Sequence, residues 1–332
     1  MKILVIQTAF TGDVVLATGV VEKIHQHFPD SQIDFLLRKG NEGLLENHPF
    51  LHEVLIWDKK QNKLANLFRL ISRVRKNKYD VVINLHRFAS SGLITALSGS
   101  KDKRGFDKNP FSFLFTKRAA HEIGNGKHEV ERNHELINDF TDAVAAKPKL
   151  YPSEKDFKTI SNLQLPASNF KSYICIAPAS VWFTKQFPKE KWIEMINQFV
   201  PENTGVFLVG SKSDSELCES IKSQILNLKS QATFNLAGQL SFLESAALMS
   251  KATMNYVNDS APMHIASAMN TPVTAVFCST VPAFGFGPLS DQSKIVETKI
   301  NLDCRPCGLH GWKTCPKGHF KCAWSIEVGE VV

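Results

Sequence analysis

The stretch Tyr256-Val-Asn-Asp-Ser-Ala-Pro-Met-His-Ile-Ala-Ser-Ala-Met269, followed by the apolar run Val273-Thr-Ala-Val-Phe277, decides the fold class. It predicts a strand, a turn, a helix and a second strand, with Asp259 and Ser260 as N-cap candidates and Pro262 in the first helical turn. A helix that begins at the carboxyl end of a parallel strand presents unpartnered amide N–H groups, which favour an anion. On this pattern alone, an ordinary βαβ unit and an anion site are equally good interpretations.

The length and composition limit the number of domains and the kinds of partner that the chain can have. The chain has 332 residues, of which 43% are hydrophobic and 21% charged, so it is too long for one ordinary core and suits two domains. Its net charge of +7 favours anionic partners such as nucleotide phosphates, phosphorylated lipid or a membrane surface, and we expect no nucleic acid. No apolar run reaches the roughly 18 residues of a membrane span, and the start predicts a strand rather than a signal peptide. We therefore expect a cytoplasmic protein.

Short apolar runs alternate with helical patterns through the first half. Strands are expected at residues 3–6, 33–37, 54–57 and 81–85, and helices from Asp13, near 42–46 and over 62–76. This alternation predicts a parallel sheet with right-handed crossovers, which is a doubly wound α/β domain. No glycine fingerprint of the dinucleotide-binding type follows the first strand, which argues against an NAD-binding half.

The middle of the chain changes in character. Residues 101–118 carry six basic residues with four phenylalanines between them. This segment could hold a phosphorylated or lipid-linked acceptor near a membrane face, but its aromatic spacing is also that of a half-buried strand, and we favour a solvated loop with the rings folded inward. Residues 147–169 lose periodicity and predict the linker, so we place the domains at 1–155 and 156–332.

The second half repeats the alternation. Strands are expected at 173–177, 206–209, 254–257 and 273–277, and helices at 188–199, 213–228, 242–249 and directly after Ser260. The layout predicts two doubly wound, Rossmann-like domains that face a central cleft. In such sheets, ligands bind beyond the carboxyl ends of the strands.

On these segments the chain resembles glycosyltransferase family 9, the ADP-heptose:lipopolysaccharide heptosyltransferases and their relatives, which have the two-domain GT-B fold. The resembling segments follow the family's order over nearly the whole chain: residues 1–19 with the turn Thr-Gly-Asp-Val-Val-Leu, 81–85, 177–192, 205–210, 235–240 and 256–277. The resemblance implies an N-terminal acceptor-binding domain and a C-terminal domain that binds the nucleotide-sugar donor.

The resemblance also implies an activity. Family members move a sugar, by default heptose from ADP-heptose, to a lipopolysaccharide core or a related saccharide or lipid-linked surface-glycan acceptor. Inversion at the anomeric carbon without a catalytic metal or other cofactor is the family's course. A peripheral location on the cytoplasmic face of the inner membrane follows for the chain as an expectation.

Asp13 matches the family's catalytic base. An inverting transfer needs a base that takes the proton of the attacking hydroxyl, and a carboxylate can do so. An N-cap aspartate is the alternative for Asp13, and the two roles are compatible. Ser180 and Lys185 match positions that contact the donor diphosphate, where a fixed ammonium and a hydroxyl stabilise the charge of the leaving group. Thr184 is a further candidate in the same loop.

The opening stretch supplies the other donor positions implied by the resemblance. The amides of Ser260 and Ala261 would cap the diphosphate. Asp259 would orient the turn or bind a sugar hydroxyl, since a carboxylate repels phosphate. His264, one turn into the helix, could reach a phosphate, although a single helical histidine is more often packed.

The chain departs from the family at two positions. Ala261 stands where the family commonly has glycine, and Lys212 aligns with a glutamate that binds the nucleoside ribose in related heptosyltransferases. A lysine cannot accept a hydrogen bond from a ribose hydroxyl, so the base and sugar of the donor stay open. These departures leave two alternatives: a non-catalytic nucleotide-sugar or glycan-binding member of the family, and another GT-B nucleotide-sugar enzyme such as an epimerase.

Four cysteines close the chain in the pattern Cys304-x2-Cys307-x7-Cys315-x6-Cys322. Four thiolates satisfy tetrahedral zinc, and the opening Cys-x2-Cys is typical of such sites. The second pair is spaced more widely than in a zinc ribbon, and His310 and His319 are alternative ligands. We expect a structural zinc site, with reduced, packed cysteines or disulfides as the other interpretations.

Overall fold

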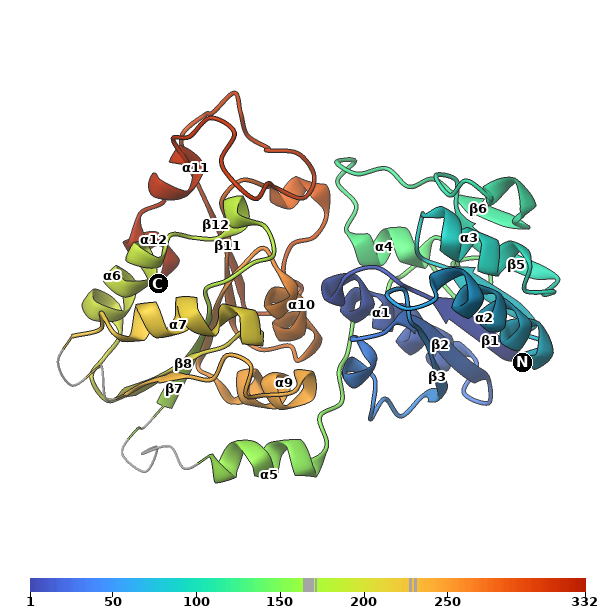
Figure 1. Cartoon of the computed structure of the whole chain (residues 1–332), viewed down its shortest axis with the longest axis horizontal. Helices are drawn as coiled ribbons and strands as arrows, with labels where there is room; N and C mark the ends of the chain where they lie inside the picture. The colour runs from blue at the N-terminus through green and yellow to red at the C-terminus, as the bar shows by residue number, and fades with distance from the viewer. Residues whose placement is uncertain (164–169, 171, 227–228, 230–231) are drawn as a thin grey trace. The chain divides into compact units, whose positions relative to one another are not determined.

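The chain folds into two compact units, Met1–Tyr151 and Pro152–Val332. The structure is a computed structural model that describes residues 1–163, 170, 172–226, 229 and 232–332 (Figure 1). The boundary after Tyr151 lies four residues before the end of the expected N-terminal domain at residue 155. The end of the expected linker, residues 164–169, lies outside the described residues.

Unit 1 contains a six-stranded parallel sheet in the order β3-β2-β1-β4-β5-β6. The strands are β1 (Lys2–Ile6), β2 (Gln32–Arg38), β3 (Leu51–Trp57), β4 (Val81–Asn84), β5 (Asp102–Phe106) and β6 (Lys117–Ala119). The central strands are apolar on both faces and buried, as a doubly wound sheet requires, apart from the exposed Lys2 at the start of β1 and the buried, polar Asn84 at the end of β4. The strand order reverses between β1 and β4, where Ile6 pairs with Asn84, and ligands of such sheets bind at this switch point.

Helices cover both faces of the first sheet. They are α1 (Thr11–His27), α2 (Lys63–Asn77), α3 (Ala89–Ala96) and α4 (Glu129–His134), with 3₁₀ turns η1 (Glu42–Leu44) and η2 (Ser112–Leu114). Helices α1 and α4 contact each other, as do α2 and α3. Right-handed crossovers place the helices that follow β1 and β3 on opposite faces, because the chain crosses the sheet in one direction from β1 to β2 and in the other direction from β3 to β4.

The segment 101–118 differs from the expected solvated loop. It forms β5, η2 and β6, which extend the sheet to its edge. Phe106 and Phe115 are buried, whereas Phe113 is 70% exposed, so the alternative of a half-buried strand describes part of this segment better. The expected helix at 42–46 is only the 3₁₀ turn η1.

Unit 2 repeats the same topology. Its sheet has the order β12-β11-β10-β7-β8-β9, which in chain order is the arrangement of the first sheet. The strands are β7 (Ser172–Ala177), β8 (Thr204–Leu208), β9 (Thr233–Asn235), β10 (Met254–Asn258), β11 (Val273–Phe277) and β12 (Ser293–Glu297). The switch point lies between β7 and β10, where Val257 pairs with Ala177.

Helices of unit 2 again flank the sheet (Figure 1). They are α5 (Glu154–Asn162), α6 (Lys189–Phe199), α7 (Ser215–Lys222), α9 (Phe242–Lys251), α10 (Ala261–Ala268), α11 (Lys321–Trp324) and α12 (Val328–Val331), with 3₁₀ turns η4 (Phe183–Lys185), η5 (Lys212–Asp214) and η6 (Pro282–Phe284). Part of the expected linker is thus helix α5, whose Ser153 caps the amide of Asp156. The expected helix 213–228 is shorter, and residues 227–228 lie outside the described residues.

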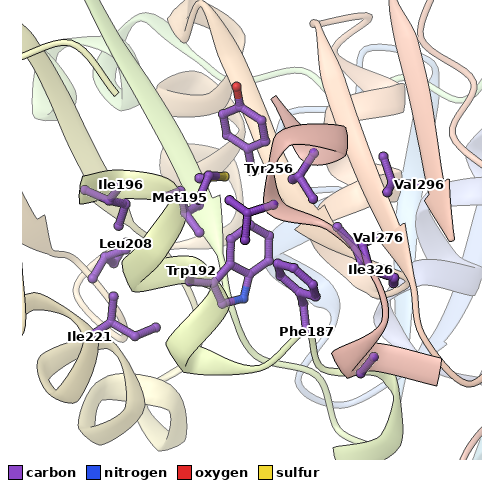
Figure 2. Packing of buried hydrophobic residues seen from close by; sticks show 14 of the residues in the cluster. Phe187, Trp192, Met195, Ile196, Leu208, Ile221, Tyr256, Val276, Val296 and Ile326 are labelled. Carbon is purple, nitrogen blue, oxygen red and sulfur yellow. The ribbon is translucent and has the colours of Figure 1, made fainter. Parts of the chain in front are cut away.

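An aromatic pair anchors the core of unit 2 (Figure 2). Phe187 and Trp192 pack edge to face with ring centroids 5.0 Å apart, and both are almost fully buried. Phe187 ends the loop that follows β7, while Trp192 belongs to α6, so this contact joins the loop to the core. Truncating such an aromatic residue costs about 3–5 kcal/mol.

The two parallel sheets with flanking helices confirm the expected α/β class, and two such doubly wound units in one chain are the plan of the expected GT-B fold. Within the described ranges, no helix combines the length and the apolar character that crossing a membrane requires.

Candidate active site

Two loops form the candidate donor site of unit 2. One follows β7 and contains Ser180 and Lys185, and the other follows β10 and contains Asp259 and Ser260. Because β7 and β10 pair in parallel at the switch point, their carboxyl ends lie side by side, and the two loops must meet.

The side chain of Asn258 links the loop after β10 to the loop after β7 through hydrogen bonds. It is the last residue of β10 and is fully buried. Its side-chain amide donates to the carbonyl oxygen of Pro178 at 2.8 Å, and its Oδ1 accepts the amide proton of Phe187 at 2.8 Å. One side chain thereby supplies hydrogen-bond partners for backbone groups at both ends of the loop after β7.

The loops also share an ion pair. The ammonium of Lys185 lies 2.6 Å from Oδ2 of Asp259, and the hydroxyl of Thr280 donates to the same oxygen at 2.6 Å. The side chains of Lys185 and Asp259 are only 15% and 8% exposed, so the pair lies in a site where electrostatic interactions are stronger than in water. The carboxylate thereby fixes the position of the cation.

Helix α10 begins directly beside this pair. Ser260 is its N-cap, Ala261 its first residue, and Pro262 occupies the first turn as the sequence predicts. The first amides of a helix lack helical partners and favour an anion. His264 lies one turn further and is buried, 6% exposed, which agrees with the packed alternative for this residue.

Asp13 lies in unit 1, in the first turn of α1. Helix α1 begins at Thr11, so Asp13 is its third residue and not its N-cap. Its Oδ2 accepts the amide proton of Phe10 at 3.0 Å. This is the reciprocal half of a capping box, which leaves the second carboxylate oxygen for other contacts.

The pKa of Asp13 is raised to about 6. Burial of the carboxyl is the main cause and the negative charge of Glu129 the second, while the amides of Phe10 and Asp13 and the charge of Arg38 oppose them. A carboxylate destabilised in this way holds a proton more firmly, and the effective bases near neutral pH have such pKa values.

Cations gather at the carboxyl edge of the first sheet. Lys59 donates to the carbonyl oxygen of Thr8 at 2.9 Å, and burial together with the charges of Arg38 and Lys63 lowers its pKa to about 8. His86 lies 3.0 Å from the hydroxyl of Thr8, and burial and the neighbouring cations lower its pKa to about 3. The histidine is therefore neutral, and the edge attracts anions through Lys59 and Arg38.

All seven cysteines of the chain, each within the described ranges, lie outside disulfide bonds in the structure. The four clustered thiols influence one another: burial and the neighbouring Cys315 raise the pKa of Cys307, and burial with the same neighbour raises the pKa of Cys322 to about 11. Cys304 lies 3.9 Å from His319. Among the described residues, no group of three or more ligating side chains is placed to hold a metal ion.

The structure brings the expected donor residues together at one end of the second sheet, with Ser180 and Lys185 in the loop after β7 and Asp259, Ser260, Ala261 and His264 around the start of α10. Asp13 belongs to the other unit and is described with it. Sequence reasoning missed Asn258, Thr280 and Arg305, which support the loops. A polar residue at the carboxyl end of a predicted strand was the available signal for Asn258.

Lys212 occupies the start of η5, after β8. Gly238 approaches it so closely that a Cβ atom there would lie 2.6 Å from the Cα of Lys212. Gly238 also has a φ of +75°, a conformation that glycine adopts without strain. The backbone of Lys212, the residue that the resemblance aligns with a ribose-binding glutamate of relatives, is therefore held by close packing against Gly238.

Comparison with known proteins gives a family match along most of the chain. The model of glycosyltransferase family 9 (heptosyltransferase) matches residues 67–311. Lipopolysaccharide heptosyltransferase 1 of Campylobacter coli is 24% identical over 314 residues, which cover 90% of each chain. Lipopolysaccharide heptosyltransferase 3 of Escherichia coli is 27% identical over 279 residues, which cover 82% of each chain.

Solved structures share the fold. The ADP-heptose lps heptosyltransferase II of E. coli has a TM-score of 0.80 at 22% identity, over 92% of this chain and 96% of that one. A family 9 glycosyl transferase from Veillonella parvula has a TM-score of 0.85 at 20% identity, over 99% and 94% of the two chains. With a family match over more than half of its length, the chain belongs to glycosyltransferase family 9 and is a glycosyltransferase.

Proposed function

We propose that this glycosyltransferase moves a heptose from ADP-heptose, with inversion and without a catalytic metal, to a lipopolysaccharide core or a related surface glycan. The donor and acceptor are taken from the relatives' names. The observation that carries the proposal is the carboxyl group of Asp13, whose pKa of about 6 suits a general base.

The proposed reaction is a single displacement. The oxygen of an acceptor hydroxyl attacks the anomeric carbon, the bond from that carbon to the diphosphate oxygen breaks, and Asp13 takes the hydroxyl proton. Attack from the face opposite the leaving group inverts the anomeric configuration. The nucleoside diphosphate departs with the bonding electron pair.

The donor loops suit the leaving group. Negative charge grows on the diphosphate as the bond breaks, and donors already fixed in place stabilise it without reorganisation. We assign this role to Lys185, to the hydroxyl of Ser180 and to the amides of Ser260 and Ala261. Asp259 then keeps Lys185 in position, as its 2.6 Å ion pair suggests.

The test begins with donor choice. Purified protein is screened for thermal stabilisation by ADP-, GDP- and UDP-sugars, and we expect ADP-heptose to give the largest shift. Transfer is then assayed for wild type, Asp13→Ala and the control Asp30→Ala, with product configuration read by NMR and with EDTA present. Undiminished transfer by Asp13→Ala removes Asp13 as the base, while stabilisation without transfer by wild type favours the non-catalytic alternative.

We propose that the protein works at the cytoplasmic face of the inner membrane through the outer surface of α2. Residues 59–78 carry eight lysine and arginine residues and no acidic residue. Leu64 and Phe68, one turn apart on this helix, are 69% and 61% exposed. Cations around an exposed apolar pair suit an anionic lipid surface.

We propose a structural zinc in the cysteine tail, separate from catalysis. The donor set has the right chemistry and its thiols lie near one another, but they do not converge on one point in the described structure. Elemental analysis of freshly purified protein for zinc, iron and other transition metals tests this. About one metal per chain is expected for a four-thiolate site, and a metal-free, fully reduced protein supports packed cysteines instead.

A further inference from the structure

Residues 305–312 of the cysteine tail contact the two loops that hold Lys185 and Thr280 in the candidate donor site. We infer that this segment, called the tail strap here, positions both partners of the Lys185–Asp259 ion pair. The inference rests on the proposed function, because it assumes that this ion pair belongs to the donor site. The strap acts through Thr184 on one side and through Thr280 on the other.

Thr184 connects the strap to the loop that carries Lys185. It is 1% exposed. Its amide donates to the carbonyl oxygen of Trp312 at 3.1 Å, and its Oγ1 accepts the amide proton of Trp312 at 2.8 Å. The hydroxyl of Ser279 donates to the same Oγ1 at 3.0 Å. Three hydrogen bonds therefore fix the residue that immediately precedes Lys185.

Gly311 makes this contact sterically possible. Its φ is +76°, and a Cβ atom built there would lie 2.8 Å from Oγ1 of Thr184 and 3.1 Å from Cγ of Lys185. The backbone of the strap is thus packed directly on the two residues. Gly318 has a similar φ of +72°, but a Cβ atom there meets nothing within 4 Å.

Arg305 connects the strap to the segment after β11 that contains Thr280. Its guanidinium donates to the carbonyl oxygen of Cys278 at 2.8 Å and to that of Thr280 at 2.7 Å, and it pairs with Glu297 at 2.6 Å. These carbonyl groups follow β11, where the Thr280 hydroxyl donates to Asp259. Arg305 therefore fixes the hydrogen-bond donor that orients the carboxylate.

The strap also contacts the thiols. The amide of Cys307 donates to the carbonyl oxygen of Ser279 at 2.7 Å, and its thiol lies in hydrogen-bond contact with the side chain of Trp312. Ser279 and Trp312 are the two residues that bind Thr184. The cysteine tail is thus connected to Lys185 through an unbroken set of contacts, and we assign Thr184, Gly311 and Arg305 as positioning residues.

Calorimetry with ADP, GDP and UDP tests the inference, using the one that wild type binds most tightly. We expect Thr184→Val and Gly311→Ala to raise its Kd about tenfold, the loss of about 1.4 kcal/mol that one charged hydrogen bond commonly represents. Thr184→Ser keeps the hydroxyl and should restore affinity to within about twofold of wild type, a difference below 0.5 kcal/mol.

Matched controls separate positioning from stability. Thr271→Val removes another buried threonine hydroxyl of unit 2, which donates to Met249 at 3.0 Å, and Gly318→Ala repeats the backbone strain without the contact. Both should lower Tm and leave Kd unchanged. Nucleotide binding by Thr184→Val and Gly311→Ala at wild-type affinity overturns the inference alone, whereas a wild type that binds none of the three nucleotides overturns the proposed function with it.

Discussion

Asp13 carries a charge that its surroundings disfavour, and this has a consequence for stability. Its folded-state pKa, about 6, exceeds the ordinary 3.8, so the cost of ionisation is fully present above about pH 7, shrinks as the pH falls below about 6 and disappears only below about pH 3. Asp13→Asn keeps an acceptor for the amide of Phe10 and removes the charge. We expect it to stabilise the protein by roughly 1–2 kcal/mol at pH 8, discounted for partial exposure, with only about a third of that gain at pH 4.5, while transfer falls at least 100-fold.

Thermal unfolding at the two pH values measures this. The control is Asp156→Asn, which changes the equivalent capping-box position of α5 and should give a small loss of stability at both pH values. If Asp13 served the helix cap alone, its asparagine variant would follow the control and keep full activity.

The acid limb of the pH–rate profile should report the same carboxyl group. If Asp13 is the base, as we propose, its carboxylate is the active form, and kcat/KM should fall about tenfold per pH unit below about pH 6. Arg38 lowers the pKa of Asp13, so Arg38→Met should move this limb to higher pH, by a few tenths of a unit for a partly solvated pair. Lys39→Met, the neighbouring cation that pairs with Asp58, should leave the limb in place, and an unmoved limb in Arg38→Met would show that another group titrates.

At the scale of elements, β10 contains two fully buried asparagines with different roles. Asn258 binds the donor loop, while Asn255, near the other end of the strand, donates to the carbonyl oxygens of Met249 and Pro272 at 3.1 and 3.0 Å. Replacing either by alanine leaves buried backbone groups unpaired and should cost about 2–4 kcal/mol. In urea unfolding the two variants should lose similar stability, but only Asn258→Ala should also weaken nucleotide binding in calorimetry, by about tenfold. Equal binding by both would mean that Asn258 supports the fold without shaping the site.

The central elements could be predicted from sequence because burial on both faces makes a parallel strand a continuous apolar run. The apolar composition of runs such as 3–6 and 273–277 is therefore enough to predict buried strands there. Strands β5, β6, β9 and β12 were missed. Strands β6, β9 and β12 lie at sheet edges and are only partly buried, and β5, next to an edge, begins with three charged residues, so all four resemble loops in sequence. Helix α5 was taken for linker because none of its residues is fully buried.

The residues that support the site from behind its loops were harder to predict than the candidate catalytic and donor-binding residues. Asp13, Lys185 and Asp259 lie in the loops or first helical turns that follow central strands, where pattern and family resemblance both direct attention. Thr280 and Arg305 act through contacts with residues 21 and up to 28 positions away in the sequence. No local spacing encodes such contacts, so only the folded chain shows them.

At the scale of the whole molecule, both units use the same strand order and place their chemistry at the same topological position. Asp13 follows β1 and His86 follows β4, which flank the first switch point, as Lys185 and Asp259 follow β7 and β10 at the second. One architecture therefore supplies two sites of different charge character. The first adds a protonatable carboxyl group to a cationic edge, and the second adds a paired ammonium to a helix N-terminus.

The cationic face of α2 gives a prediction for the intact protein. In flotation assays, the protein should bind vesicles that contain about 30% phosphatidylglycerol and should not bind vesicles of pure phosphatidylcholine. Binding should weaken as the salt concentration rises from about 50 to 500 mM, because the Debye length shortens. The double variant Leu64→Ser/Phe68→Ser should lose most of this binding, at least fivefold. Phe199→Ser/Leu226→Ser removes the same residue types from exposed positions of unit 2 and should bind like wild type. Equal losses in both double variants, or equal binding to neutral vesicles, would show that α2 is not the membrane-facing surface.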